Sequence, residues 1–206
     1  PSSVQLIGDS SFYGCSSLTS LIIPVSVKSI NSFAFYGCSL IKEVIIHSNL
    51  TTIEDSAFSE CSSLSQILIS STISYIGSFA FKGCSSLIDI NIPPSVTFIG
   101  NSTFCGCSLL TRITIPKTID VIKDSTFSNC SSLKQIIIPS SVHSIGMFAF
   151  YGCKSLTDIT IHESITFIGD YAFCGCSSLE QIDIFSSGIS VIKDHASNIV
   201  KNCQQL

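Results

Sequence analysis

Short apolar segments recur along the chain, each with two core-facing positions separated by one outward-facing position. In the segment 90–92, Asn91 separates two isoleucines, and this alternation with β-branched residues predicts a short strand. Equivalent strands are predicted at residues 21–23, 44–46, 67–69, 113–115, 136–138, 159–161 and 182–184. Because one such strand occurs per repeat and all have the same direction, we expect a parallel sheet.

A phenylalanine and a cysteine mark the period of this pattern. The phenylalanines stand 23 residues apart, and a cysteine follows three positions after each one. The two series are Phe12, Phe35, Phe58, Phe81, Phe104, Phe127, Phe150 and Phe173, and Cys15, Cys38, Cys61, Cys84, Cys107, Cys130, Cys153 and Cys176. A fixed period of about 20 to 50 residues is typical of a solenoid of stacked coils. The sequence therefore predicts a single array over residues 1–206, with about eight coils between residues 4 and 192.

The remainder of each coil predicts a second extended piece, a glycine turn and a short helical turn. Residues 27–30 and 96–99 have the Val-x-x-Ile pattern of the extended piece. Glycines such as Gly100 follow, where we expect tolerance of positive φ, and residues such as Asp55 are expected to cap the helical turn that carries Phe and Cys. Residues 193–206 have the apolar spacing of a helix that caps the array or leads into another repeat.

Composition narrows the classes of protein that fit such an array. Only 12% of the residues are charged and 45% are hydrophobic, which favours a continuous core over disorder. The net charge is −4 and the ten Lys and Arg are scattered, so we expect no surface for nucleic acid or anionic lipid. We find no apolar run long enough to span a membrane and no signal peptide. Because the chain starts at Pro1, part-way through a repeat, we expect it to be a fragment.

The eleven cysteines allow three interpretations: a disulfide framework, metal sites or buried thiols. Eight share one repeat position beside the phenylalanine, and we favour buried thiols because free Cys acts as a small hydrophobe. Cys105 and Cys174 lie outside that column and are expected to be accessible, for example to intermolecular disulfides. They are three coils apart, ~14 Å at the spacing of β-strands, which is too far for a disulfide between them.

Residues for catalysis or metal binding do not converge in this pattern. His47 and His162 share a repeat position but lie five coils apart, ~24 Å, while His143 and His195 belong to other parts of the coil. No spacing matches a zinc site, a nucleophile elbow or a phosphate loop. We therefore expect neither an enzyme nor a cofactor or metal site.

The repeat Ile-Gly-x-x-Ala-Phe-x-x-Cys-Ser-Ser-Leu-x-x-Ile-x-Ile-Pro resembles the BspA-like leucine-rich repeat, and residues 81–87 and 138–146 match it almost letter for letter. The resemblance covers about residues 4–192. The repeat is similar to that of the protozoan branch of the family, with 23-residue repeats. It implies a right-handed α/β superhelix, mostly β, found in large surface proteins of anaerobic bacteria and mucosal parasites and linked to adhesion, host recognition and virulence. The asparagine ladder of ordinary leucine-rich repeats is absent, so receptor-type relatives are poor guides.

Outward-facing strand positions form two columns that would line one face of the sheet, here called the strand face. The first column is polar and the second is partly apolar. They consist of Ser20, Glu43, Gln66, Asp89, Arg112, Gln135, Asp158 and Gln181, and of Ile22, Ile45, Leu68, Asn91, Thr114, Ile137, Thr160 and Asp183. An exposed stripe of Ile22, Ile45 and Leu68 indicates either an interaction site or residues chosen to stabilise the sheet. The candidate partner-binding residues are Ile22, Ile45, Leu68, Glu43, Gln66, Asp89, Arg112, Thr114, Ile137 and Asp158.

Protein recognition is the function that these features favour. From the resemblance we expect a cell-surface or secreted adhesion module that binds a host matrix or cell-surface protein, or another copy of itself, through the strand face. A spacer without its own ligand and an intracellular scaffold are the alternatives. Glycosylation sequons at Asn49 and Asn101 fall in expected loops or turns, whereas Asn129 precedes a core cysteine and is a poor acceptor.

Overall fold

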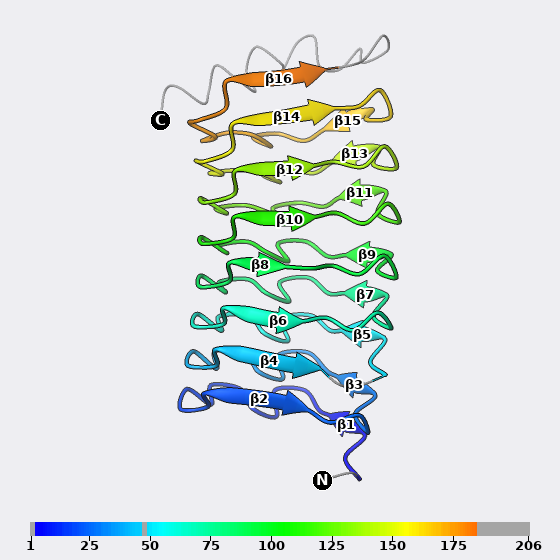
Figure 1. Ribbon diagram of the computed structural model, residues 1–206, viewed down its shortest axis with the longest axis vertical. Coiled ribbons are helices and arrows are strands. Elements are labelled where there is room, and N and C mark those ends of the chain that lie inside the picture. Colours follow the sequence, from blue (N-terminus) through cyan, green and yellow to red (C-terminus); the bar gives the residue numbers. More distant parts are fainter. Residues whose placement is uncertain (1–2, 47–48, 185–206) are drawn as a thin grey trace.

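The computed structural model describes residues 3–46 and 49–184, which wind into a stack of coils (Figure 1). Each coil contributes one strand to each of two ladders, and the strands of the two ladders point in opposite directions (Figure 1). The front ladder contains β2 (Ser20–Ile23), β4 (Glu43–Ile46), β6 (Gln66–Leu68), β8 (Asp89–Ile90), β10 (Arg112–Thr114), β12 (Gln135–Ile137), β14 (Asp158–Ile161) and β16 (Gln181–Ile184). The second ladder contains β1 (Leu6–Ile7), β3 (Ser29–Ile30), β5 (Thr52–Ile53), β7 (Tyr75–Ile76), β9 (Phe98–Ile99), β11 (Val121–Ile122), β13 (Ser144–Ile145) and β15 (Phe167–Ile168).

All the strand pairs are parallel, and each residue pairs with its equivalent in the next coil. Leu21 pairs with Val44, for example, and Ile113 pairs with Ile136. The front ladder comprises the sheets β2-β4-β6, β8-β10-β12 and β14-β16, and the second comprises β1-β3-β5-β7-β9 and β11-β13-β15. The predicted parallel solenoid is therefore confirmed, with front strands that begin one residue before the apolar positions.

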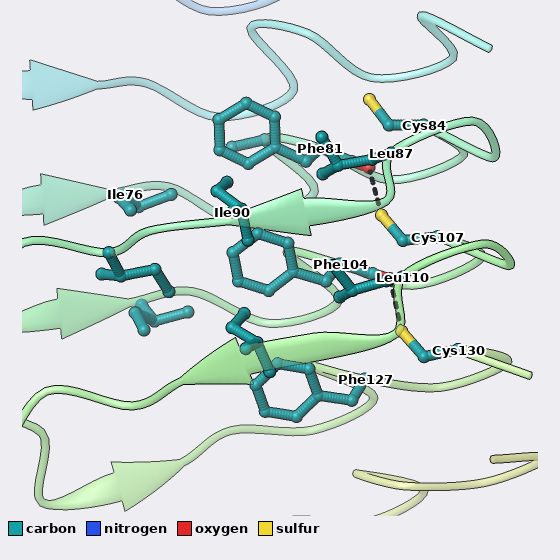
Figure 2. Packing of buried hydrophobic residues seen from close by; sticks show 14 of the residues in the cluster. Ile76, Phe81, Cys84, Leu87, Ile90, Phe104, Cys107, Leu110, Phe127 and Cys130 are labelled. Carbon is teal, nitrogen blue, oxygen red and sulfur yellow. Dashed lines mark hydrogen bonds between the residues drawn. The ribbon is translucent and has the colours of Figure 1, made fainter. Parts of the chain in front are cut away.

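The core is built from rows of identical side chains between the two ladders. Rings of the Phe series stack along the rod with centroids 5.1 to 5.8 Å apart and planes within 14° of parallel. From Cys38 onward, each thiol of the Cys series donates to the Phe carbonyl of the preceding coil, with Sγ–O distances of 3.1 to 3.3 Å (Figure 2). The Phe row thus supplies apolar contact, and the Cys row gives each Phe carbonyl a second donor besides the Cys backbone N–H of its own coil.

The short helical turns are a wrong prediction, because the residues that the structure describes contain no helix. The turn around Phe35 has residues in the left-handed region at Phe33 (φ 57) and Gly37 (φ 69), which an α-helix does not accept. Its N–H groups also have partners outside the turn. The backbone N–H groups of Phe33 and Phe35 donate to the backbone carbonyl groups of Asp55 and Ala57 in the next coil. The turns are consequently stacked as a ladder of their own.

The glycine and aspartate roles in this turn also differ from expectation. Gly77, Gly100 and their equivalents do not have positive φ. Positive φ occurs two residues after each of them, and again at a second glycine position, that of Gly14, Gly37 and Gly83. Aspartate side chains accept from backbone N–H groups of the next coil, as Asp55 does from Ser78 at 2.7 Å. Both features therefore serve the contact between coils and not the start of a helix.

The cysteine column is buried as predicted, with two corrections at particular residues. Burial raises the pKa of Cys61 to about 12 and raises that of Cys84 well above its ordinary value. Cys15 is exposed because no coil covers it within the described chain, and Cys174, expected to be accessible, is buried. Cys105 is half-buried, as its position outside the column suggested. The predicted helix at 193–206 lies outside the described residues.

Candidate functional site

The front strands position the first column of the strand face. In β4, β6, β8, β10, β12 and β14 the first residue is exposed and the second is buried, which is the alternation of a sheet with one solvated face. Ladder register places Glu43 beside Gln66, and Asp89 beside Arg112. The expected polar column is thus present from Ser20 to Asp158.

The second column contains the large apolar side chains that sequence reasoning singled out. Ile22 and Leu68 are each 65% exposed and Ile137 is 79% exposed, whereas Ile45 between the first two is half-buried. Register places Ile22, Ile45 and Leu68 side by side in three successive coils. The stripe therefore exists, but Ile45 offers less surface than expected because side chains on both sides cover it.

A second apolar point lies further along the same column, at Ile137. Ile137 is beside Thr114, with Asn91 in the coil before that one. Polar residues therefore separate Ile137 from the stripe, and the ten candidate residues form two apolar patches on one polar face and not one continuous patch.

Charge on the strand face is sparse and accessible. The Arg112 guanidinium lies 3.3 Å from an Asp89 carboxylate oxygen, and both side chains are largely exposed. Ion pairs of this kind contribute about 0 to 1 kcal/mol because water screens them. Both groups can therefore exchange this contact for one with a partner at little cost.

Other exposed apolar residues near the start of the front strands were not predicted. Leu40, Ile88 and Leu109 are about half exposed. The sequence could have indicated them, because Leu109 occupies a repeat position at which the preceding coil has a polar residue, Ser86. The polar first column lies between these residues and the apolar stripe in each coil, so they are separate apolar points.

Chemical sites are not evident in the part of the chain that the structure describes. No group of three or more His, Cys, Asp or Glu side chains there is arranged to hold a metal ion. That part of the chain also contains no helix with the length and hydrophobicity needed to cross a bilayer.

The family model described as the BspA type leucine rich repeat region (6 copies) matches this chain twice, over residues 1–111 and 97–206. The chain belongs to this family of BspA-type leucine-rich repeats. The resemblance of the Phe and Cys repeat to that family is therefore confirmed. No curated protein matches the chain.

Solved structures similar to this leucine-rich repeat array come from several bacteria. A leucine-rich repeat protein from Bacteroides ovatus is 27% identical with a TM-score of 0.61, and the match covers 88% of this chain and 64% of that one. A leucine rich cell surface protein from Faecalibacterium prausnitzii is 26% identical with a TM-score of 0.59, covering 86% and 62%. The leucine rich repeat protein of T. pallidum is 24% identical with a TM-score of 0.74, covering 88% and 83%, and shows the fold alone.

The BspA-type array therefore spans less than two thirds of the length of the first of these relatives. None of the three is described as an enzyme, and one is described as a cell surface protein. A leucine-rich repeat solenoid presents extended surfaces that suit protein binding.

Proposed function

We propose that this array is a non-catalytic adhesion or recognition module of a cell-surface or secreted protein. In this proposal it binds a host matrix or cell-surface protein through the strand face. Ile22, Leu68 and Ile137 supply apolar contact, and the flanking polar side chains orient the partner. Support for location comes from the family and from one relative described as a cell surface protein.

One observation carries the proposal: three large aliphatic side chains are exposed where the fold accepts polar ones. Asn91 and Thr114 occupy the same column in intervening coils, so the sheet does not require Ile or Leu there. Burying such a side chain stabilises a complex by about 1.5 to 3 kcal/mol. Micromolar affinity needs about 8 kcal/mol, so the apolar patches supply part of it and hydrogen bonds must supply the remainder.

The test measures binding of the array to immobilised matrix proteins and to host cells. A triple variant, Ile22→Thr with Ile45→Thr and Leu68→Thr, and a single variant, Ile137→Thr, insert a residue that the same column already holds. We expect at least a tenfold loss of affinity for the triple variant. Gln135→Ser is the matched control, because Ser20 occupies its column, and it should change affinity less than twofold.

Two alternatives have distinct outcomes in the same experiment. If neither the array nor the variants bind any protein or cell, the spacer interpretation is favoured. If the array binds only itself, sedimentation shows a dimer that the triple variant abolishes. An intracellular scaffold has some support from the buried reduced thiols, of which Cys38, Cys61, Cys84, Cys107, Cys130 and Cys153 are examples. Binding only to cytosolic proteins would favour it.

A further inference from the structure

A second surface, distinct from the strand face, is formed by the stacked turns that carry the Phe series. We call it the turn edge, and it consists of residues 8–14, 31–37, 54–60, 77–83, 100–106, 123–129, 146–152 and 169–175. The third position of each turn is serine in four coils and aromatic in the other four. The series is Ser10, Phe33, Ser56, Phe79, Ser102, Ser125, Phe148 and Tyr171.

Neither burial nor backbone preference explains the aromatic residues at this position. All eight have positive φ, between 54° and 60°, and bulky side chains disfavour that region. Phe33 is 42% exposed, Phe79 is 40% exposed and Tyr171 is 51% exposed. Since serine fills the same position in four coils, the fold has no need of a ring there.

Apart from Phe79, the exposed and half-buried aromatic rings of the turn edge gather at two places. Near the N-terminal end, Tyr13 and Tyr36 stack at 4.8 Å, and Phe33 packs against Tyr36 at 5.9 Å. Near the other end, Phe148 stacks on Tyr171 at 5.2 Å and meets Tyr151 edge-on at 5.7 Å. Aromatic clusters of this kind, rigid and partly exposed, are enriched at the centres of protein interfaces.

Charge on the turn edge indicates the chemistry of the partner. It holds six acidic residues, Asp9, Glu54, Asp55, Glu60, Asp124 and Asp170, and two basic ones, Lys82 and Lys123. The rest of the described chain has seven acidic and six basic residues, so its charges nearly balance. Most of the acidic excess therefore lies on this one surface, which also carries the aromatic rings.

The structure also shows that rings in this region accept cations. The Lys82 ammonium lies 5.8 Å from the centre of the Phe79 ring, and that of Lys123 lies 5.1 Å from the centre of the Phe98 ring in β9. Lys82 occupies the repeat position that is Tyr36 and Tyr151 in the two aromatic clusters. The clusters are thus versions of the same site without their own lysine at that position.

We propose that the turn edge binds an arginine-rich segment of a partner protein. Guanidinium groups are planar, stack on aromatic faces and donate hydrogen bonds to carboxylate oxygens, so they match both features of this surface. Phe33 and Phe148 are five coils apart, ~24 Å at the spacing of strands. An extended segment of about seven or eight residues spans that distance. This binding is independent of the strand face.

The test is a titration with nona-arginine, monitored by tyrosine fluorescence. The chain has no tryptophan, and four of its five tyrosines lie on the turn edge, so the signal reports on this surface. The main variant combines Phe33→Ser with Phe148→Ser, which inserts the residue found at this position in four other coils. Removing one cation–π contact weakens binding roughly two- to fivefold, so we expect roughly 4- to 25-fold for the pair.

Three further arms distinguish stacking from simple charge attraction. Lys82→Ser inserts the residue that Ser59 and Ser128 provide at the same repeat position; it uncovers Phe79 and should tighten binding about two- to fivefold. Nona-lysine should bind more weakly than nona-arginine, and so should tri-arginine, which reaches only one cluster. Ile137→Thr on the strand face should leave the titration unchanged, so that failure here is separate from failure of the proposed adhesion function.

Either of two results would overturn the proposal. If the Phe33→Ser and Phe148→Ser variant binds nona-arginine as tightly as the original chain, the rings do not take part. If nona-lysine binds as tightly as nona-arginine, the surface attracts positive charge without recognising guanidinium groups. Circular dichroism of each variant before titration confirms that the array is folded.

Discussion

Gly100 and Gly8 occupy the same repeat position in different surroundings, and alanine at each position tests how closely the coils approach. A Cβ added to Gly100 would lie 2.3 Å from the backbone nitrogen of Ser78 and 2.6 Å from the carbonyl carbon of Gly77. A Cβ added to Gly8 would meet no atom within 4 Å, because no described coil precedes it. The same substitution is therefore a clash in one coil and harmless in the other.

The expected magnitude follows from how far the neighbouring coil must move. An ordinary contact requires the Gly100 Cβ and the Ser78 backbone to separate by about 1 Å, and overpacking of this kind costs about 1 to 3 kcal/mol. Other coils hold Asn31, Glu54 and Lys123 at this position, so the backbone can open locally. We expect Gly100→Ala to lower the free energy of unfolding by about 2 kcal/mol. Gly8→Ala should leave it unchanged or raise it by up to about 1 kcal/mol, since alanine reduces the entropy of the unfolded chain.

Urea unfolding followed by far-ultraviolet circular dichroism measures both changes, provided that the slope of the transition is the same for each variant. If the glycines were needed for positive φ, both alanine variants would lose stability by a similar amount. That result would contradict close approach between coils as the reason for glycine. A Gly100→Ala variant as stable as the original chain would contradict the packing itself.

Three other predictions concern the buried rows and the left-handed residues. Phe81→Ala should cost about 4 kcal/mol and Phe12→Ala about 2 kcal/mol in urea unfolding, because Phe81 is fully buried between two stacked rings while Phe12 is 41% exposed with one; equal losses would refute this. Burial raises the pKa of thiols such as Cys61 and Cys84 above the unfolded value of 9.0, so their contribution to stability is complete below pH 9 and declines above it. The free energy of unfolding should decline by about 1.4 kcal/mol per buried thiol at pH 10, and Cys84→Ser should make this decline smaller. A urea unfolding midpoint that stays constant from pH 8 to 10 would exclude the effect. Glu60→Gly should stabilise by about 1 kcal/mol, because Glu60 has φ 60 where six coils have glycine, whereas Gly83→Ala should destabilise; the reverse order would show that this strain is absent.

Repeat phase was sufficient to predict the ladders and the buried rows. A residue that returns every 23 positions contacts its own equivalents, so the burial of Phe81 and Cys84 follows from the periodicity together with their apolar character. The turn was beyond this reasoning for a physical reason. Ala, Phe and Asp are ordinary residues of a capped helical turn. The turn is not helical here because its backbone N–H groups donate to carbonyl groups of the next coil. These hydrogen bonds depend on stacking, which local propensity does not include.

The strand face was predicted to the level of which positions face outward, but not how exposed each side chain is. Ile22, Ile45 and Leu68 share one position, yet Ile45 is covered by neighbours on both sides. Cys174 shares a position with Cys105, yet it is buried where Cys105 is half-buried. The exposure of a side chain depends on the size of the side chains at the same repeat position in the adjacent coils. It therefore cannot be read from the pattern of one repeat.

The positions that vary between coils carry information about function because the fold does not determine them. Each coil contacts only its neighbours, so a position where both serine and phenylalanine occur is one where stacking accepts either residue. The positive φ of such a ring lowers stability, and its partial burial offsets this cost only in part. Phe33, Phe79 and Tyr171 are such rings, and Ile22, Leu68 and Ile137 are exposed aliphatic side chains at positions that also accept polar residues. Contact with a partner is the simplest explanation of these six residues, and serine or threonine at each position removes that contact with a residue that other coils already hold there.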